Sequence, residues 1–201
     1  MNYLAIDTSG KNLTVIIKKE EKTFIFHDDK CGVSHSVELM PRVEELAKSA
    51  DFDFNSADFF ACVVGAGSFT GIRIGVATVK AMCFAFNKPC LSVTSFDTLA
   101  YNEDGQVLAV IDAKHNGFYV CGYLDKKVCF EPAYLMREKV IELAKDYKIV
   151  SFEEIDGFDV KVVSIPQGLI NAIEKKQDEI TSNLDRLEPL YVRKSQAEEG
   201  R

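Results

Sequence analysis

Gly65-Ala66-Gly67-Ser68-Phe69-Thr70-Gly71-Ile72-Arg73-Ile74-Gly75 is the stretch that decides the fold of this 201-residue chain. It follows an apolar run, Phe59–Val64, and opens a second long apolar segment that ends at Phe86. This order predicts a strand, a glycine loop and a helix, because glycines permit turns and close backbone contacts that side chains would block. The first amides of the helix could also face an anion. The spacing fits neither G-x-x-x-x-G-K-[ST] nor G-x-G-x-x-G, so close packing is favoured and ligand binding is the alternative.

The composition is that of a globular protein with an acidic balance. Apolar residues make up 47% of the chain, charged residues 27%, and the formal net charge is −7. A chain of this length can bury enough surface to fold without a disulfide or a metal. An acidic protein is a poor docking surface for a polyanion, so a role in nucleic-acid chemistry would need a basic partner to hold the RNA or DNA.

Six cysteines are present, and none of them forms a C-x-x-C pair. Most lie in apolar runs, which favours buried, reduced thiols over zinc ligands or disulfides. The N-terminus begins with a strand-like segment and shows no signal-peptide pattern. We expect no membrane span and a cytoplasmic location.

The first half of the chain alternates strand and helix patterns. Strands are predicted at Tyr3–Asp7, Leu13–Lys18, Thr23–His27, Phe59–Val64 and Cys90–Val93. Helices are predicted at Ser36–Ala50 and Ile72–Phe86, and Thr94–Asp97 is a capping box for a third, short helix.

The pattern then restarts. Leu4-Ala5-Ile6-Asp7 can be overlaid on Ala109-Val110-Ile111-Asp112, and both are followed by a polar turn, two further strands and a helix, the later one expected at Leu135–Tyr147. The repeat predicts an α/β fold of two lobes, residues 1–102 and 103–193, with a polar tail at 194–201. The second lobe has no counterpart of the glycine loop.

Asp7 ends the first strand and precedes Thr8-Ser9-Gly10. In a two-lobed phosphotransferase such an Asp would orient a metal-bound water, and the turn would meet phosphate oxygens. A tight turn that bonds its own backbone is the favoured interpretation, because a second phosphate loop and an adenine-binding glycine loop are both missing.

The other candidate chemistries find little support. The histidines, His27, His35 and His115, lack metal-ligand spacing, G-x-S-x-G does not occur, and no cysteine has a cationic setting. We therefore expect no catalytic residue, no metal site and no cofactor. His35 is expected to be exposed or to lie in an interface.

The helix predicted at Ile72–Phe86 is apolar over nearly its whole circumference, with Arg73, Thr78 and Lys80 as the polar exceptions. A helix that is apolar all round is buried all round. One face can rest on the sheet, and the other is expected to meet a neighbouring helix or a partner chain. With Ser36–Ala50 it could form half of a four-helix interface. Complete coverage by the chain's own elements is the alternative.

These residues resemble a known family. Gly65–Gly75 is similar to the G-P-G-S-F-T-G-L-R-x-G segment of the TsaB (YeaZ) family, with Ala66 where the family usually has Pro. Tyr3–Ser9 and Glu188–Arg193 resemble its other marks, so the resemblance covers essentially the whole chain. The family's D-A-R-R-x-E-V-Y pattern stands here as D-A-K-H-N-G-F-Y at Asp112–Tyr119, in which both Arg positions and the Glu are replaced.

The resemblance implies the actin/hexokinase-like (ASKHA) fold, built from two ribonuclease-H-like lobes of mixed sheets flanked by helices. It implies a role in making N6-threonylcarbamoyladenosine (t6A) at position 37 of tRNA, where the related subunit TsaD carries the metal and transfers the threonylcarbamoyl group and TsaE is the ATPase. By this resemblance the chain is a non-catalytic subunit that meets tRNA only indirectly. It docks to a TsaD-like protein, acts with a TsaE-like protein and forms a homodimer when alone.

Two sets of site residues follow. The glycine loop, Gly65, Gly67, Ser68, Phe69, Thr70, Gly71 and Arg73, is expected to set the start of the second helix. The partner interface is expected at His35, Leu39, Val43, Gly75, Val76, Val79, Lys80 and Cys83, and charged replacements of Val76 or Val79 are expected to abolish partner binding while the fold stays intact. The alternatives are a phosphotransferase of the same fold class that uses Asp7 and a metallopeptidase, which would need a metal.

Overall fold

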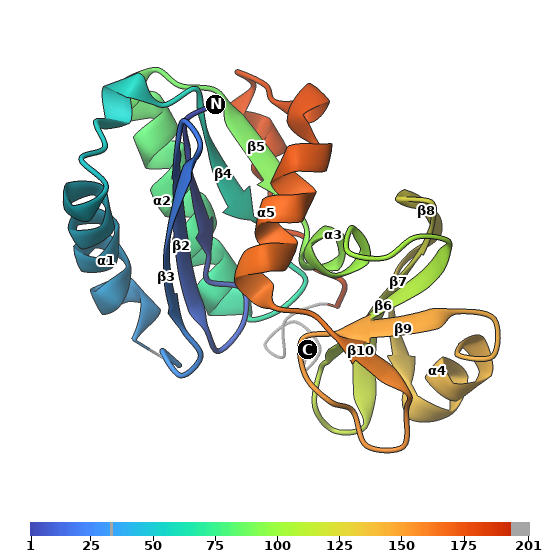
Figure 1. The fold of residues 1–201 in the computed structure, drawn as a ribbon. Helices are drawn as coiled ribbons and strands as arrows, with labels where there is room; N and C mark the ends of the chain where they lie inside the picture. The colour runs from blue at the N-terminus through green and yellow to red at the C-terminus, as the bar shows by residue number, and fades with distance from the viewer. Residues whose placement is uncertain (33, 194–201) are drawn as a thin grey trace.

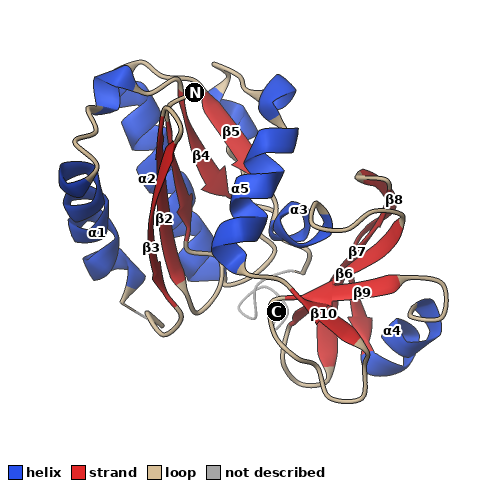
Figure 2. Ribbon diagram, in the orientation of Figure 1, coloured by secondary structure: helices blue, strands red, loops and turns tan. Residues whose placement is uncertain are grey.

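Two five-stranded mixed sheets with helices on their faces make up the computed structural model, which describes residues 1–32 and 34–193 (Figures 1 and 2). The polar tail expected at 194–201 lies outside the described residues.

The first sheet has the order β3-β2-β1-β4-β5. Its strands are β1 (Tyr3–Asp7), β2 (Leu13–Lys19), β3 (Lys22–Asp28), β4 (Phe59–Val63) and β5 (Cys90–Val93). The first three form an antiparallel meander, and β4 and β5 run parallel to β1. β1 and β4 are buried throughout, as expected for apolar strands that are covered on both faces.

Helices cover both faces of this sheet (Figure 1). α1 (His35–Ser49) and α2 (Phe69–Phe86) pack on one face of the sheet, against strand side chains such as Leu4 and Ile6. α5 (Ile165–Lys175) packs on the opposite face, against the alternating side chains such as Tyr3 and Ala5. α2 is 18 residues long and, by length and composition alone, could cross a membrane, contrary to the expectation that no stretch reaches that length. Its buried side packs on β1 and β4, as the core helix of a globular domain does.

The second sheet repeats the topology of the first, with the order β10-β9-β6-β7-β8. Its strands are β6 (Gln106–Asp112), β7 (Gly117–Leu124), β8 (Lys127–Met136), β9 (Lys148–Ser151) and β10 (Val160–Val162). The predicted duplication and the two-lobed fold class are therefore confirmed. The topology also shows where the second copy is shorter: residues 152–159 connect β9 to β10 without a counterpart of α2.

The helix predicted at Leu135–Tyr147 is shorter than expected, since α4 spans Arg137–Leu143. β8 continues to Met136 because its last residues stay paired with the start of β7, Leu135 opposite Phe118. The ladder thus overrides the helical pattern of these residues.

The two halves exchange helices. α3 (Ser95–Ala100) belongs to the first half of the chain but packs on β6, β7 and β9, whereas α5 belongs to the second half and packs on the first sheet. α3 and α5 also pack on each other, so closely that a Cβ on Gly168 would lie 2.3 Å from the Thr98 carbonyl oxygen.

A buried ionic cluster fixes this exchange. Asp97 forms the predicted capping box with Thr94, accepts a hydrogen bond from the Tyr123 hydroxyl at 2.9 Å and pairs with the Lys176 ammonium at 2.8 Å. Burial lowers the pKa of Lys176, but the charges and hydrogen bonds of Asp97 and Glu179 together outweigh burial and leave the pKa raised, so the ammonium stays charged. Burial, followed by the Asp97 charge, raises the pKa of Tyr123, so the phenol remains a donor.

We expect Asp97→Ala to lower the free energy of unfolding by about 3–5 kcal/mol, because the buried Lys176 ammonium then keeps only the half-exposed Glu179 carboxylate, at 3.2 Å, as a partner. Urea denaturation measures this loss. Asp159→Ala removes an exposed carboxylate in the second lobe and should cost less than about 0.5 kcal/mol. An equal loss of unfolding free energy in the two variants would contradict the stabilising role assigned to Asp97.

Candidate functional site

The glycine loop lies between β4 and α2, at the carboxyl end of the central strands. Gly65 and Gly67 have φ of +112° and +150°, which L side chains rarely adopt. Ser68 caps α2, its hydroxyl accepting from the Gly71 amide at 3.2 Å. The loop therefore sets the start of α2 through its backbone conformation and one cap.

The space in front of the loop is filled by the turn between β1 and β2. The Ser68 amide donates to the Ser9 carbonyl at 2.6 Å, and the Thr8 hydroxyl donates to the Gly71 carbonyl at 2.7 Å. A Cβ on Gly67 would lie 2.1 Å from the Ser9 oxygen, and one on Gly71 would lie 2.0 Å from the Thr8 oxygen. These glycines permit backbone-to-backbone contact, which is the close-packing interpretation.

Asp7 lies beneath this contact and is almost fully buried. One carboxylate oxygen accepts from the Ser9 amide at 2.8 Å and from the Ser9 hydroxyl at 2.7 Å, and the Ser9 hydroxyl also lies 3.1 Å from that of Ser95. Burial raises the pKa of Asp7, although the bonds from Ser9 oppose the shift. Asp7 thus holds a turn together, and this setting does not favour a solvent-facing catalytic role.

Asp112 is the counterpart of Asp7 in the second lobe, but its surroundings differ. It pairs with Lys114 at 2.6 Å at the surface, in a turn where Lys114, His115 and Asn116 all have positive φ. Partial burial alone would raise the pKa of Asp112, but the hydrogen bonds from Lys114 outweigh it and lower the pKa.

The residues expected at a partner interface lie mostly inside the chain. His35, Leu39, Val43, Gly75, Val76, Val79 and Cys83 are buried, and Lys80 is half-buried. Val79 in particular is fully buried in the first-lobe core. A charge there would disrupt the core, so the expectation that the fold would stay intact is wrong for Val79.

The exposed face of α2 carries different residues: Arg73, Ala77, Ala81 and Phe84, of which Phe84 is 84% exposed. On α1, Val37 is 70% and Met40 42% exposed. Both helices lie on the same face of the first sheet (Figure 1). The sequence could not separate the two sides of α2, because both are apolar.

His35 is buried, contrary to the expectation that it would be exposed or lie in an interface. Its Nε2 lies 2.7 Å from the Asn12 carbonyl oxygen, which ties the start of α1 to the β1–β2 turn. His27 bridges the Thr14 hydroxyl and the Asp29 carboxylate, each at 2.8 Å. Within residues 1–32 and 34–193, no group of three His, Cys, Asp or Glu side chains could hold a metal ion.

Five of the six cysteines are buried as free thiols, as predicted, and Cys129 is exposed. Burial raises the pKa of Cys83 and Cys121 to about 12. These thiols are therefore protonated at neutral pH and are poor nucleophiles.

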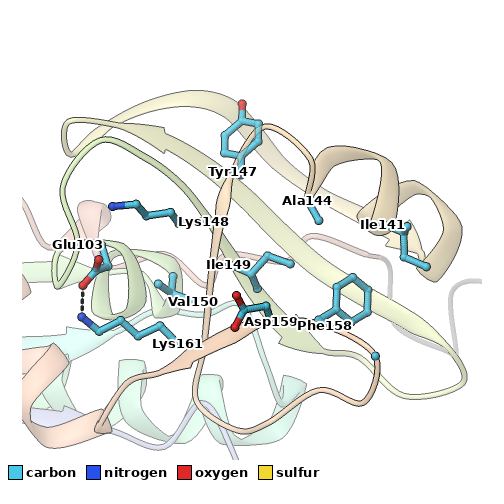
Figure 3. A pocket seen from close by; sticks show the side chains of 11 residues that line it. Glu103, Ile141, Ala144, Tyr147, Lys148, Ile149, Val150, Phe158, Asp159 and Lys161 are labelled. Atoms are coloured by element: carbon cyan, nitrogen blue, oxygen red, sulfur yellow. Dashed lines mark hydrogen bonds and ion pairs between the residues drawn. The ribbon is translucent and has the colours of Figure 1, made fainter.

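A hollow of about 500 Å³ lies in the second lobe, beside α4 and the start of β9 (Figure 3). Ile149 and Phe158 contribute its apolar lining, Glu103 pairs with Lys161, and Lys148 is exposed. It lies away from the glycine loop, and its charged side chains are paired or exposed. We assign no chemistry to it.

Comparison with known proteins fits this geometry. The family model described as "TsaD: tRNA N6-adenosine threonylcarbamoyltransferase" matches residues 26–176. The chain belongs to this family. The similar curated proteins are named TsaB and the similar solved structure YeaZ, in agreement with the resemblance predicted from the glycine segment.

Among curated relatives, the TsaB of Bacillus subtilis is 31% identical over 134 residues, which is 65% of this chain and 58% of that protein. The TsaB of Escherichia coli is 28% identical over 128 residues, 61% of this chain and 55% of that protein. The chain thus spans a little over half the length of these relatives. Both are named tRNA threonylcarbamoyladenosine biosynthesis proteins.

Among solved structures, YeaZ from Pseudomonas aeruginosa superimposes with a TM-score of 0.79 over 94% of this chain and 99% of that one, at 22% identity. This likeness supports the fold of both lobes.

We expect Gly67→Ala to destabilise the protein far more than Gly105→Ala. Both glycines have positive φ, but a Cβ at Gly105 meets nothing within 4 Å, whereas at Gly67 it overlaps the Ser9 oxygen. Gly105→Ala should cost about 1–2 kcal/mol from backbone strain alone. Denaturant unfolding measures the loss of unfolding free energy in each variant. Equal losses in Gly67→Ala and Gly105→Ala would contradict the close-packing interpretation of the loop.

Stability against pH tests the state of Asp7. Because its pKa is raised in the folded protein, ionising this carboxyl weakens the fold as pH rises above the unfolded-state pKa of about 4. We expect the unfolding free energy of Asp7→Asn, relative to wild type, to increase as the pH rises above about 4 towards the raised pKa of the folded state. Asp159→Asn, at the surface, is the control. If the difference in unfolding free energy between Asp7→Asn and wild type did not change with pH, the pKa of Asp7 would not be raised in the folded protein.

Proposed function

We propose that this chain is a non-catalytic subunit required for t6A formation at position 37 of tRNA. In this role it docks to a TsaD-like transferase subunit, acts with a TsaE-like protein and activates the transferase. The family membership and the names of its TsaB relatives support the process. Because the chain matches a little over half of each relative, the activity and the partners are part of the proposal.

The exposed apolar face of α2 is the observation that carries the docking step. Phe84 projects from the end of a helix whose exposed positions at Ala77 and Ala81 are small. An exposed phenyl ring beside small side chains suits close packing by another helix. Val37 and Met40 of α1 add apolar surface on the same side of the sheet.

The buried residues expected at the interface support this face from within. Leu39, Val43 and Val79 pack α1 and α2 onto the sheet. Lys80, half-buried on α2, is the one of the eight that can also reach a partner directly. The glycine loop sets where α2 begins, and thereby where its exposed face points.

The setting of Asp7 supports the proposal of a role without catalysis. The turn that would meet phosphate in a phosphotransferase is packed against the glycine loop, and its carboxylate is bonded to Ser9. The net charge of −7 disfavours direct binding of tRNA, so the RNA would be held by a partner. We propose a homodimer through the same face when the chain is alone, and a cytoplasmic location.

Phe84→Glu should weaken binding to the TsaD-like protein at least about tenfold while the melting temperature stays near that of wild type, because it charges an exposed apolar contact. Binding is measured by calorimetry with the purified partner. Ile141→Glu is the matched control, since Ile141 is also an exposed apolar residue on a helix, but in the second lobe. Unchanged affinity in Phe84→Glu would exclude this face.

The cellular role is tested by the t6A content of tRNA, measured by mass spectrometry of nucleosides from cells that lack this chain. We expect t6A to fall, and to be restored by wild type and Ile141→Glu but not by Phe84→Glu. Normal t6A without the chain would refute the proposed process itself.

A further inference from the structure

The segment Leu187–Arg193 runs from the first lobe onto the second. Leu187 is fully buried in the core of the first lobe. Leu190 packs against the cores of both lobes, and Val192 packs against the core formed by α3 and the second sheet. The Arg193 guanidinium lies 4.7 Å from the ring centre of Tyr134, on β8. Seven residues thus contact both lobes in succession.

The same segment lies directly on the glycine loop. The Leu190 amide donates to the Val64 carbonyl at 2.7 Å, and a Cβ on Gly65 would lie 2.7 Å from the Leu190 carbonyl oxygen. Residues 190–192 belong to no helix or strand. Side-chain contacts and one backbone bond therefore hold the segment in place.

An aromatic contact anchors the segment at the surface. The Tyr191 ring stacks on Phe69 with centroids 4.1 Å apart and an interplanar angle of 17°. The Arg73 guanidinium lies 4.2 Å from the Phe69 centroid, and its Nε donates to the Tyr191 hydroxyl at 2.8 Å. Tyr191 is 38% exposed, so this anchor can open without leaving a cavity in the core.

Other contacts also join the lobes: α3 packs on α5, and Asp97 of α3 pairs with Lys176, which directly follows α5. The chain crosses between them at residues 101–105 and 163–164, where α3 and α5 meet. The Lys11–Glu153 ion pair also links the lobes, but both side chains are largely exposed, and such pairs contribute little. Leu187–Arg193 is the further tie that passes over the glycine loop.

We propose that Leu187–Arg193 is an interlobe latch, closed by the Phe69–Tyr191–Arg73 stack. When the latch is closed, it fixes the angle between the lobes and holds the glycine loop against its neighbours. When Tyr191 detaches, the lobes move about the two crossovers, and the start of α2 loosens. This is a property of the chain alone, so it can fail without affecting the proposed role in t6A formation.

Tyr191→Ala opens the latch, and Tyr191→Phe is the matched control that keeps the ring stack but loses the bond to Arg73. In hydrogen exchange of the isolated chain, we expect Tyr191→Ala to raise exchange at Leu190 and at residues 64–71 roughly tenfold, since a stacked pair and a cation–π contact are lost. Tyr191→Phe should change it much less. Arg73→Ala, a second surface variant, should act in the same direction as Tyr191→Ala.

Lobe movement is measured by the distance between spin labels on the exposed Cys129 and on an engineered Lys48→Cys in α1, because the other cysteines are buried. We expect the distance distribution to broaden in Tyr191→Ala and to stay narrow in wild type, in Tyr191→Phe and in the surface variant Ile141→Ala. An unchanged distribution in Tyr191→Ala, or faster exchange confined to residues 187–193, would overturn the latch.

Discussion

The contact between the glycine loop and the β1–β2 turn is the constraint on which the rest of the structure depends. Two glycines allow the backbones at Ser9 and Thr8 to approach at distances that any Cβ would prevent. This contact fixes the first turn of α2, and with it the direction of the exposed helix face. It also fills the place where a phosphate group would have to enter. This one backbone contact therefore fits the proposed docking surface on α2 better than a nucleotide site at the loop.

The exchange of α3 and α5 makes the lobes structurally interdependent. Each sheet receives one covering helix from the other half of the chain, and Asp97 joins that exchange to β7 and to Lys176. A buried carboxylate with three kinds of partner is costly to disturb. This buried junction restrains movement of one lobe against the other, and the proposed latch at Tyr191 adds a second, more exposed restraint.

Much of the fold could be predicted because the signals were local. Apolar runs ending in Asp predicted β1 and β6, and Thr94 with Asp97 predicted the cap of α3. The exposed side of α2 could not be predicted, since Val79 and Phe84 are equally apolar and only the position of the sheet separates them. His35 was likewise misplaced, because its partner is a carbonyl 23 residues away in sequence.

Asp7 lies at a position in the fold that would suit catalysis, but its burial and hydrogen bonds disfavour a catalytic role of its carboxylate. Its position at the end of the central strand would suit a catalytic carboxylate, but catalysis needs an oxygen that can reach water or substrate. Here one oxygen is bonded twice to Ser9, and burial disfavours the charge. Gly67 and Gly71, which allow the β1–β2 turn to pack against the loop, also position the start of α2. The backbone that closes the turn over Asp7 therefore also sets the exposed face of α2, so catalysis at Asp7 and the proposed docking through α2 would make opposite demands on the same backbone contact.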